Sequence, residues 1–74
     1  MNNKRRLQLR EWIKRIDVIK SELESICSDE EEYFERLENL QSSPNGMNSE
    51  EAIDKMNDAI VCIEEAVEAI EEII

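Results

Sequence analysis

The last third of this chain carries apolar residues at alternating spacings of three and four positions, without interruption. Such spacing places the side chains on one face of an α-helix. A second row, with members seven positions apart, flanks the first, and together the two rows are wide enough to contact two neighbouring helices. The main row is Ile53, Met56, Ile60, Ile63, Val67, Ile70 and Ile74, and the flanking row is Ala52, Ala59, Ala66 and Ile73.

The first half of the chain carries a similar row, which predicts a second long helix. Ser28 followed by Glu31 has the pattern of a helix N-cap. The apolar spacing is nevertheless the same on both sides of Ser28, so we expect one continuous or slightly bent helix over about residues 4–42. Its row is Leu9, Trp12, Ile16, Ile19, Leu23, Ile26, Glu30, Tyr33, Leu37 and Leu40.

A Pro-Asn-Gly sequence at residues 44–46 separates the two predicted helices. Proline cannot continue a helix, and Asn-Gly favours the positive φ angles of a tight reversal, so we expect a turn over residues 43–48. Asn48 and Glu51 have the spacing of a capping pair and predict a second helix over about residues 49–74. The predicted fold class is therefore all-α, an antiparallel, coiled-coil-like two-helix hairpin.

A reversal near Asn45 would pair residues whose numbers sum to about 91 and place Ile74 beside Asp17. The first helix would then extend about 20 Å beyond the second, at 1.5 Å per residue, with its apolar side chains uncovered. A single domain over residues 1–74 is also too short to bury a large core alone. We therefore expect a homo-oligomer, preferably a dimer that forms a four-helix bundle. Its predicted interface is Leu9, Trp12, Ile13, Ile16, Ile60, Ile63, Val67, Ile70 and Ile74.

The formal net charge of −10 is unevenly distributed, with +5 over residues 1–20 and −15 over residues 21–74. Basic residues around Trp12 are typical of a site for an anionic ligand, although a charged flank of the oligomer interface is the favoured interpretation. This basic arm is Arg5, Arg6, Arg10, Lys14 and Arg15. An acidic row is a candidate target-binding face or DNA mimic, although a solvated outer face is favoured. It is Asp54, Asp58, Glu65, Glu68 and Glu72.

Reaction chemistry is not evident in the sequence. The chain has no histidine, and Cys27 and Cys62 form no Cys-x-x-Cys motif, so we expect no enzyme activity, no cofactor, no metal and two free thiols. No run approaches the roughly 18 apolar residues of a membrane span, and no signal-peptide pattern follows Met1. These features predict a cytoplasmic protein with no membrane contact, and we do not expect direct binding to duplex DNA.

The segment Glu31–Ser43 contains the sequence Glu-Asn-Leu-Gln at residues 38–41, followed by Ser43. In this it resembles uncharacterised small acidic proteins of bacteria and their phages, which share a Glu-Asn-Leu-Gln-x-Ser core before an acidic helix. The resemblance covers roughly residues 20–74 and implies a helical hairpin from a mobile element in a bacterial host. By analogy, it suggests a non-enzymatic protein that binds and inhibits or sequesters a host defence component. The alternatives are a structural homo-oligomer and an acidic DNA mimic.

Overall fold

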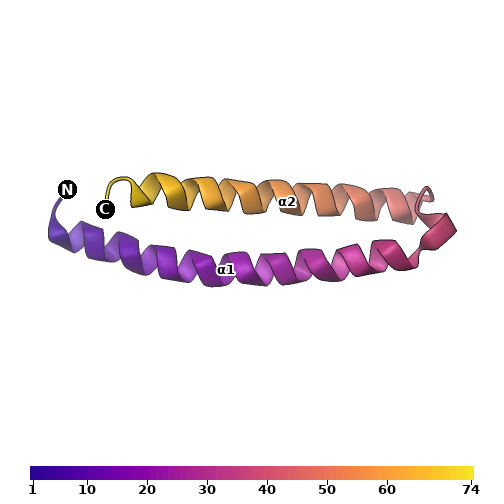
Figure 1. Cartoon of the computed structure of the whole chain (residues 1–74), viewed down its shortest axis with the longest axis horizontal. Helices are drawn as coiled ribbons and strands as arrows, with labels where there is room; N and C mark the ends of the chain where they lie inside the picture. The colour runs from indigo at the N-terminus through magenta and orange to yellow at the C-terminus, as the bar shows by residue number, and fades with distance from the viewer.

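Two long helices, packed against each other, make up almost the whole chain, and the computed structural model describes all 74 residues. Helix α1 spans Asn3–Arg36, a short 3₁₀ helix η1 spans Glu38–Leu40, and α2 spans Pro44–Glu71. The two helices run antiparallel, with both termini at one end and η1 at the other (Figure 1). The hairpin measures 56 × 16 × 12 Å. The predicted all-α class and the two-helix hairpin are confirmed.

Helix α1 begins one residue before the predicted start and ends six residues before the predicted end. Asn2 is the N-cap, and its Oδ1 accepts a hydrogen bond from the backbone N–H of Arg5 at 2.9 Å. The helix passes through Ser28 without a break, as expected. It ends at Arg36 because Glu38 has a φ of 49°, a left-handed conformation in which an α-helix of L-residues cannot continue.

The start of α2 differs from the prediction. Ser43, not Asn48, is the N-cap, and its Oγ accepts a hydrogen bond from the backbone N–H of Gly46 at 3.2 Å. Pro44 occupies the first turn of the helix, where its missing N–H costs nothing and its fixed φ suits the helix. The predicted turn over residues 43–48 and the predicted helix start at residue 49 are therefore wrong.

Gly46 is needed for close approach and not for a positive φ, since no glycine of this chain has one. It lies buried in the first turn of α2. A Cβ at this position would lie 2.7 Å from the Cα of Gln41 and 2.5 Å from its carbonyl carbon, both backbone atoms of the turn. Gly46 thus lets α2 start directly against the turn that precedes it.

The early start of α2 changes which residues of the two helices lie level with each other. Three contacts between the helices join residues whose numbers sum to 84: Arg10 with Ile74, Lys20 with Glu64, and Cys27 with Asn57. The predicted sum of 91 was too large by one heptad. Ile74 accepts a hydrogen bond from Arg10 at 3.4 Å and does not lie beside Asp17. The prediction of a long uncovered N-terminal arm is therefore wrong.

Helix α2 presents its predicted row to α1, but α1 is rotated from its predicted orientation. All seven members of the α2 row are half-buried. From Ile19 onward, every second member of the predicted α1 row is exposed, and the residue that follows it in the sequence is half-buried or buried instead. The residues of this row and its neighbours that are half-buried or buried are Leu9, Trp12, Ile13, Ile16, Lys20, Leu23, Cys27, Glu30 and Phe34 of α1 and Leu37 just after it, whereas Ile19, Ile26 and Tyr33 of α1 and Leu40 of η1 are exposed.

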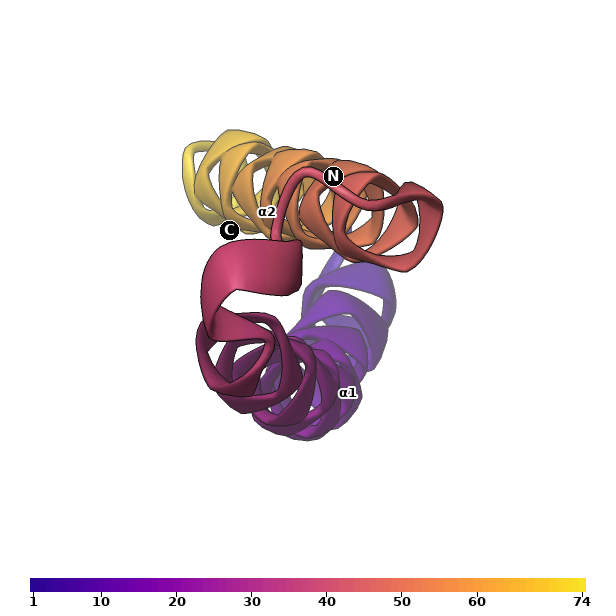
Figure 2. The same ribbon diagram turned by 90° about the vertical axis from the view of Figure 1, so that its right-hand side faces the viewer.

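The hairpin has almost no core. Cys27 is its only buried hydrophobic side chain, 3% exposed, and Ser49 is the only buried polar one. Viewed along its length, the molecule consists of two helices with no further element over either of them (Figure 2). Most apolar residues of the interface between the helices are consequently only half covered.

Candidate interaction surface

The interface between α1 and α2 is flanked by two surfaces of opposite character. In an antiparallel helix pair, each helix contributes one row of residues, seven positions apart, to each flank of the interface. Rows that occupy the same heptad position in the two helices lie on the same flank. We call one flank the polar side, which comprises Asp17, Glu24 and Glu31 of α1 with Asn57, Glu64 and Glu71 of α2. We call the other the apolar side, which comprises Trp12, Ile19, Ile26 and Tyr33 of α1 with Ala52, Ala59 and Ala66 of α2 and Ile73, which follows the end of α2.

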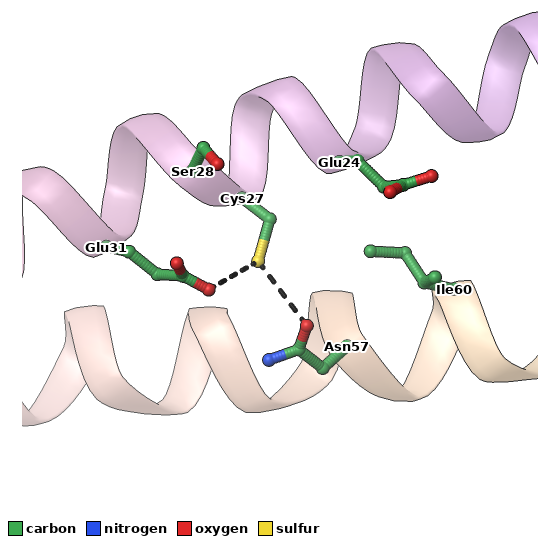
Figure 3. Close-up of a pocket in the computed structure, with 6 residues that line it drawn as sticks. All are labelled: Glu24, Cys27, Ser28, Glu31, Asn57 and Ile60. Carbon is green, nitrogen blue, oxygen red and sulfur yellow. Dashed lines mark hydrogen bonds between the residues drawn. The ribbon is translucent and has the colours of Figure 1, made fainter.

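On the polar side, Cys27 joins the two helices. Its Sγ lies 3.6 Å from Glu31 Oε1 and 3.7 Å from Asn57 Oδ1, and it donates toward both oxygens (Figure 3). Burial raises the pKa of the Cys27 thiol, and the hydrogen bond and negative charge of Glu31 raise this pKa further. The thiol therefore stays protonated. It acts as a hydrogen-bond donor in the interface and not as a nucleophile.

Two further polar contacts link the helices. Lys20 Nζ lies 3.3 Å from Glu64 Oε1 across the interface and 4.0 Å from Glu24 Oε1 on its own helix. Near the turn, the Ser49 hydroxyl donates to Glu30 Oε1 at 2.7 Å. Polar pairs at interior positions lose their partners if the helices slip, so they specify one alignment at some cost in stability. The polar contacts thus fix the register of the hairpin.

The apolar side has no comparable contacts. Ile26 is 58% exposed, Ile19 51%, Ile73 50% and Tyr33 40%. Within α2 itself the residues on this side are small, since Cys62 lies between Ala59 and Ala66 on the helix surface, and the large Ile73 follows the end of the helix. A continuous row of large apolar side chains beside a row of small ones is typical of a surface that contacts another protein.

Every residue of the apolar side was named from the sequence, but its α1 members were assigned to the row that faces the second helix. The nine residues of the predicted oligomer interface are half-buried beside the opposite helix of the same chain. Trp12 also belongs to the apolar side, and a role of all nine residues in an intermolecular contact stays a prediction. The two heptad rows that form the apolar side, one through Ile19 and one through Ala59, were both among the predicted apolar rows, and the sequence did not show that they lie on the same side of the hairpin.

The predicted basic arm does not gather into one site. Arg10 hydrogen-bonds the carbonyl of Ile74, and Lys14 lies 3.6 Å from Glu11. Arg6 is half-buried, and its Nε has no hydrogen-bond partner. Arg5 and Arg15 are exposed. Because two of the five have partners within the chain and none lines a groove, an anionic ligand stays a prediction.

The predicted acidic face lies on the outside of α2, away from α1. All five of its residues are exposed, and none forms an ion pair within the chain: Asp54, Asp58, Glu65, Glu68 and Glu72. This placement fits a solvated surface and is equally open to a partner. A role in target binding or DNA mimicry stays a prediction.

No three histidine, cysteine or acidic side chains are grouped so that they could hold a metal ion. Neither helix has a stretch long and apolar enough to cross a lipid bilayer. Comparisons with protein-family models, curated proteins and solved structures find no match to this chain. The family resemblance stays a prediction, and the candidate site is the apolar side.

Proposed function

We propose that this chain is a non-enzymatic binding protein that holds a helical protein partner against its apolar side. The observation that supports the proposal most strongly is the exposed row of Ile19, Ile26 and Tyr33, which no element of the chain covers. Burial of one large aliphatic side chain contributes about 1.5–3 kcal/mol. Because these side chains are already about half covered, a partner can bury only the remaining half of each, and several in one row together favour association.

A helix is the element that fits this surface best. The apolar side is a long, straight strip formed by two antiparallel helices, with large residues along one edge and small residues along the other. A partner helix packs along such a strip through side chains at spacings of three and four. The resemblance to phage and bacterial proteins extends the proposal to a host component as the partner, which would be inhibited or sequestered by the complex.

Photo-crosslinking inside the producing cell tests the proposal. The photoreactive residue p-benzoylphenylalanine replaces either Tyr33, on the apolar side, or its neighbour Glu32, which is exposed on the outer face of α1. After irradiation, we expect covalent adducts from position 33 and not from position 32, with adducts identified by mass spectrometry. Absence of adducts from position 33, or the same adducts from both positions, would contradict the proposal.

A further inference from the structure

We infer that the helical partner of the apolar side is a second copy of this chain, packed antiparallel to the first to form a four-helix bundle. In this arrangement the turn of each hairpin lies beside the open end of the other. The inference rests on the proposed function and names the partner for the same surface. Three observations support it: the exposed area, the centre of the apolar side and the distribution of charge.

The hairpin exposes more surface than a compact protein of its size. Its accessible surface is 5732 Å². A folded monomer of 8.7 kDa is expected to expose about 4,700 Å², so the excess is about 1,000 Å². A standard protein interface buries about 800 Å² on each partner. The excess of one chain therefore matches the area that one partner of a stable dimer buries.

The apolar side is symmetric about its own centre. In α1 its four residues centre between Ile19 and Ile26, and in α2 they centre at Cys62 and Ile63, between Ala59 and Ala66. Because level residues of the two helices have numbers that sum to 84, these two centres lie at the same height along the hairpin. A two-fold axis perpendicular to the helices can therefore pass through both centres, as a closed dimer requires.

Such an axis brings each helix against the same helix of the second copy. Ile19 then packs on Ile26 of the second copy, and Trp12 packs on Tyr33 of the second copy, which gives an aliphatic centre with an aromatic pair at each end. In α2 the small residues Ala59 and Ala66 meet, so those two helices can approach closely. At the centre of the strip, large residues meet large ones and small residues meet small ones, whereas at its ends Ala52 meets Ile73 of the second copy.

Charge selects the antiparallel arrangement over the parallel one. The turn half of the hairpin, residues 21–61, holds twelve acidic and two basic residues, for a net charge of −10. The open half, residues 1–20 with 62–74, holds seven of each and is neutral. A parallel dimer would place two halves of charge −10 together, whereas the antiparallel dimer places each acidic half beside the basic residues of the other copy.

Light scattering of the purified protein tests self-association. Ile19 and its neighbour Val18 are similarly exposed, at 51% and 59%, but Val18 lies on the outer face of α1. We expect twice the chain mass for the wild type and for Val18→Asp, and the mass of one chain for Ile19→Asp. A wild-type mass of one chain at micromolar concentration would overturn the inference, as would a dimer that Ile19→Asp leaves intact.

The native thiols test the antiparallel arrangement without a change to the apolar side. Cys62 is exposed and lies at the proposed two-fold axis, so copper–phenanthroline with dissolved oxygen should convert two Cys62 thiols into an intermolecular disulfide. A parallel dimer would instead place Cys62 against α1 of the second copy, away from the other Cys62. We expect a covalent dimer from the wild type and from Cys27→Ser, none from Cys62→Ser, and much slower formation in Ile19→Asp. A non-covalent dimer in which Cys62 does not crosslink would overturn the antiparallel arrangement.

Failure of this inference is distinguishable from failure of the proposed function. If the purified chain is a monomer while position 33 still crosslinks specifically to a different protein in cells, the apolar side binds a partner that is not a second copy. If position 33 forms no adducts at all, the proposed function itself fails. Self-adducts from position 33 with a doubled mass in solution support both.

Discussion

The polar side and the apolar side of this hairpin are built from equivalent heptad positions, yet they have different roles. On the polar side, Cys27 contacts Asn57 and Lys20 pairs with Glu64, so the side chains of the two helices meet within one chain. On the apolar side, Ile26 is 58% exposed and Tyr33 is 40% exposed, and neither has a polar contact across the interface. The comparison indicates that this chain uses polar contacts to align its own helices and leaves hydrophobic area for a partner.

The largest expected effect separates the two sides directly. Ile19→Asp, on the apolar side, should lower the midpoint of thermal unfolding and abolish its dependence on protein concentration, because association stabilises the folded chain by mass action. Glu24→Ala, on the polar side, should leave that dependence unchanged, since Glu24 makes only one exposed ion pair, at 4.0 Å from Lys20. Circular dichroism melts at several concentrations measure both. A wild-type midpoint that does not vary with protein concentration would contradict the claim that the apolar side, unlike the polar side, binds a second copy.

The second effect concerns the turn, which lets α2 start directly against the residues that precede it. Gly46→Ala places a methyl group against the backbone of Gln41, which cannot move without disturbing the start of α2. We expect a loss of about 1–3 kcal/mol in the free energy of unfolding, as for other overpacked sites, measured by urea denaturation. Asn45→Ala, one residue earlier and exposed, is the control and should cost much less. Equal losses in the two variants would show that close approach at Gly46 is not required.

The third effect tests whether polar contacts align the helices. Ser49→Ala removes the hydroxyl that donates to Glu30 at 2.7 Å and leaves that carboxylate facing α2 without this partner. A hydrogen bond to a charged group contributes about 1.5–3 kcal/mol, and the partial exposure of Glu30 places the expected loss near the lower end. The double variant Ser49→Ala with Glu30→Ala should recover part of the loss, because it removes the unpaired charge. Additive losses in a double-mutant cycle would mean that the pair contributes nothing to the alignment.

A fourth, smaller effect should be stabilising. Glu38 has a φ of 49°, a conformation that costs an L-residue about 1–2 kcal/mol and costs glycine almost nothing. Glycine also gains freedom in the unfolded chain, so we expect Glu38→Gly to raise the free energy of unfolding by up to about 1 kcal/mol. Glu35→Gly, within α1, should lower the free energy of unfolding by a similar amount. If Glu38→Gly destabilises the hairpin, the left-handed end of α1 is not its conformation in solution.

The smallest effect follows from the thiol on the interface. Burial and Glu31 raise the pKa of Cys27 above its ordinary value of 9.0, so the folded chain holds this proton more tightly than the unfolded chain does. Below pH 9.0 the thiol is protonated in both the folded and the unfolded chain, so it adds no pH dependence to the free energy of unfolding. Above pH 9.0 the thiol ionises first in the unfolded chain, so the free energy of unfolding falls. Relative to Cys27→Ala, the wild type should therefore lose stability as pH rises through and above 9.0, measured by urea denaturation. Parallel pH profiles for the two proteins would contradict the burial of Cys27.

The sequence predicted the helices, their antiparallel order and the face of α2, because the row from Ile53 to Ile74 has only one consistent phase. It did not predict the rotation of α1. There, the rows through Ile26 and through Cys27 are both compatible with a helix interface, and the choice depends on whether Lys20 and Cys27 find partners across the interface. The register was wrong because Pro44 was assigned to the turn, when proline is equally favourable at a helix start. The α1 half of the apolar side consists of residues that the sequence had assigned to the interface with α2, so the error in the rotation of α1 concealed it.

Small-angle X-ray scattering of the purified wild type tests the central claim most directly, because one experiment reports both mass and length. A single hairpin is 56 Å long and has a mass of 8.7 kDa. Two copies packed antiparallel along their apolar sides should double the mass and leave the longest dimension essentially unchanged. A particle with the mass of one chain, or one with doubled mass and a much greater length, would contradict the claim that a second copy covers the apolar side.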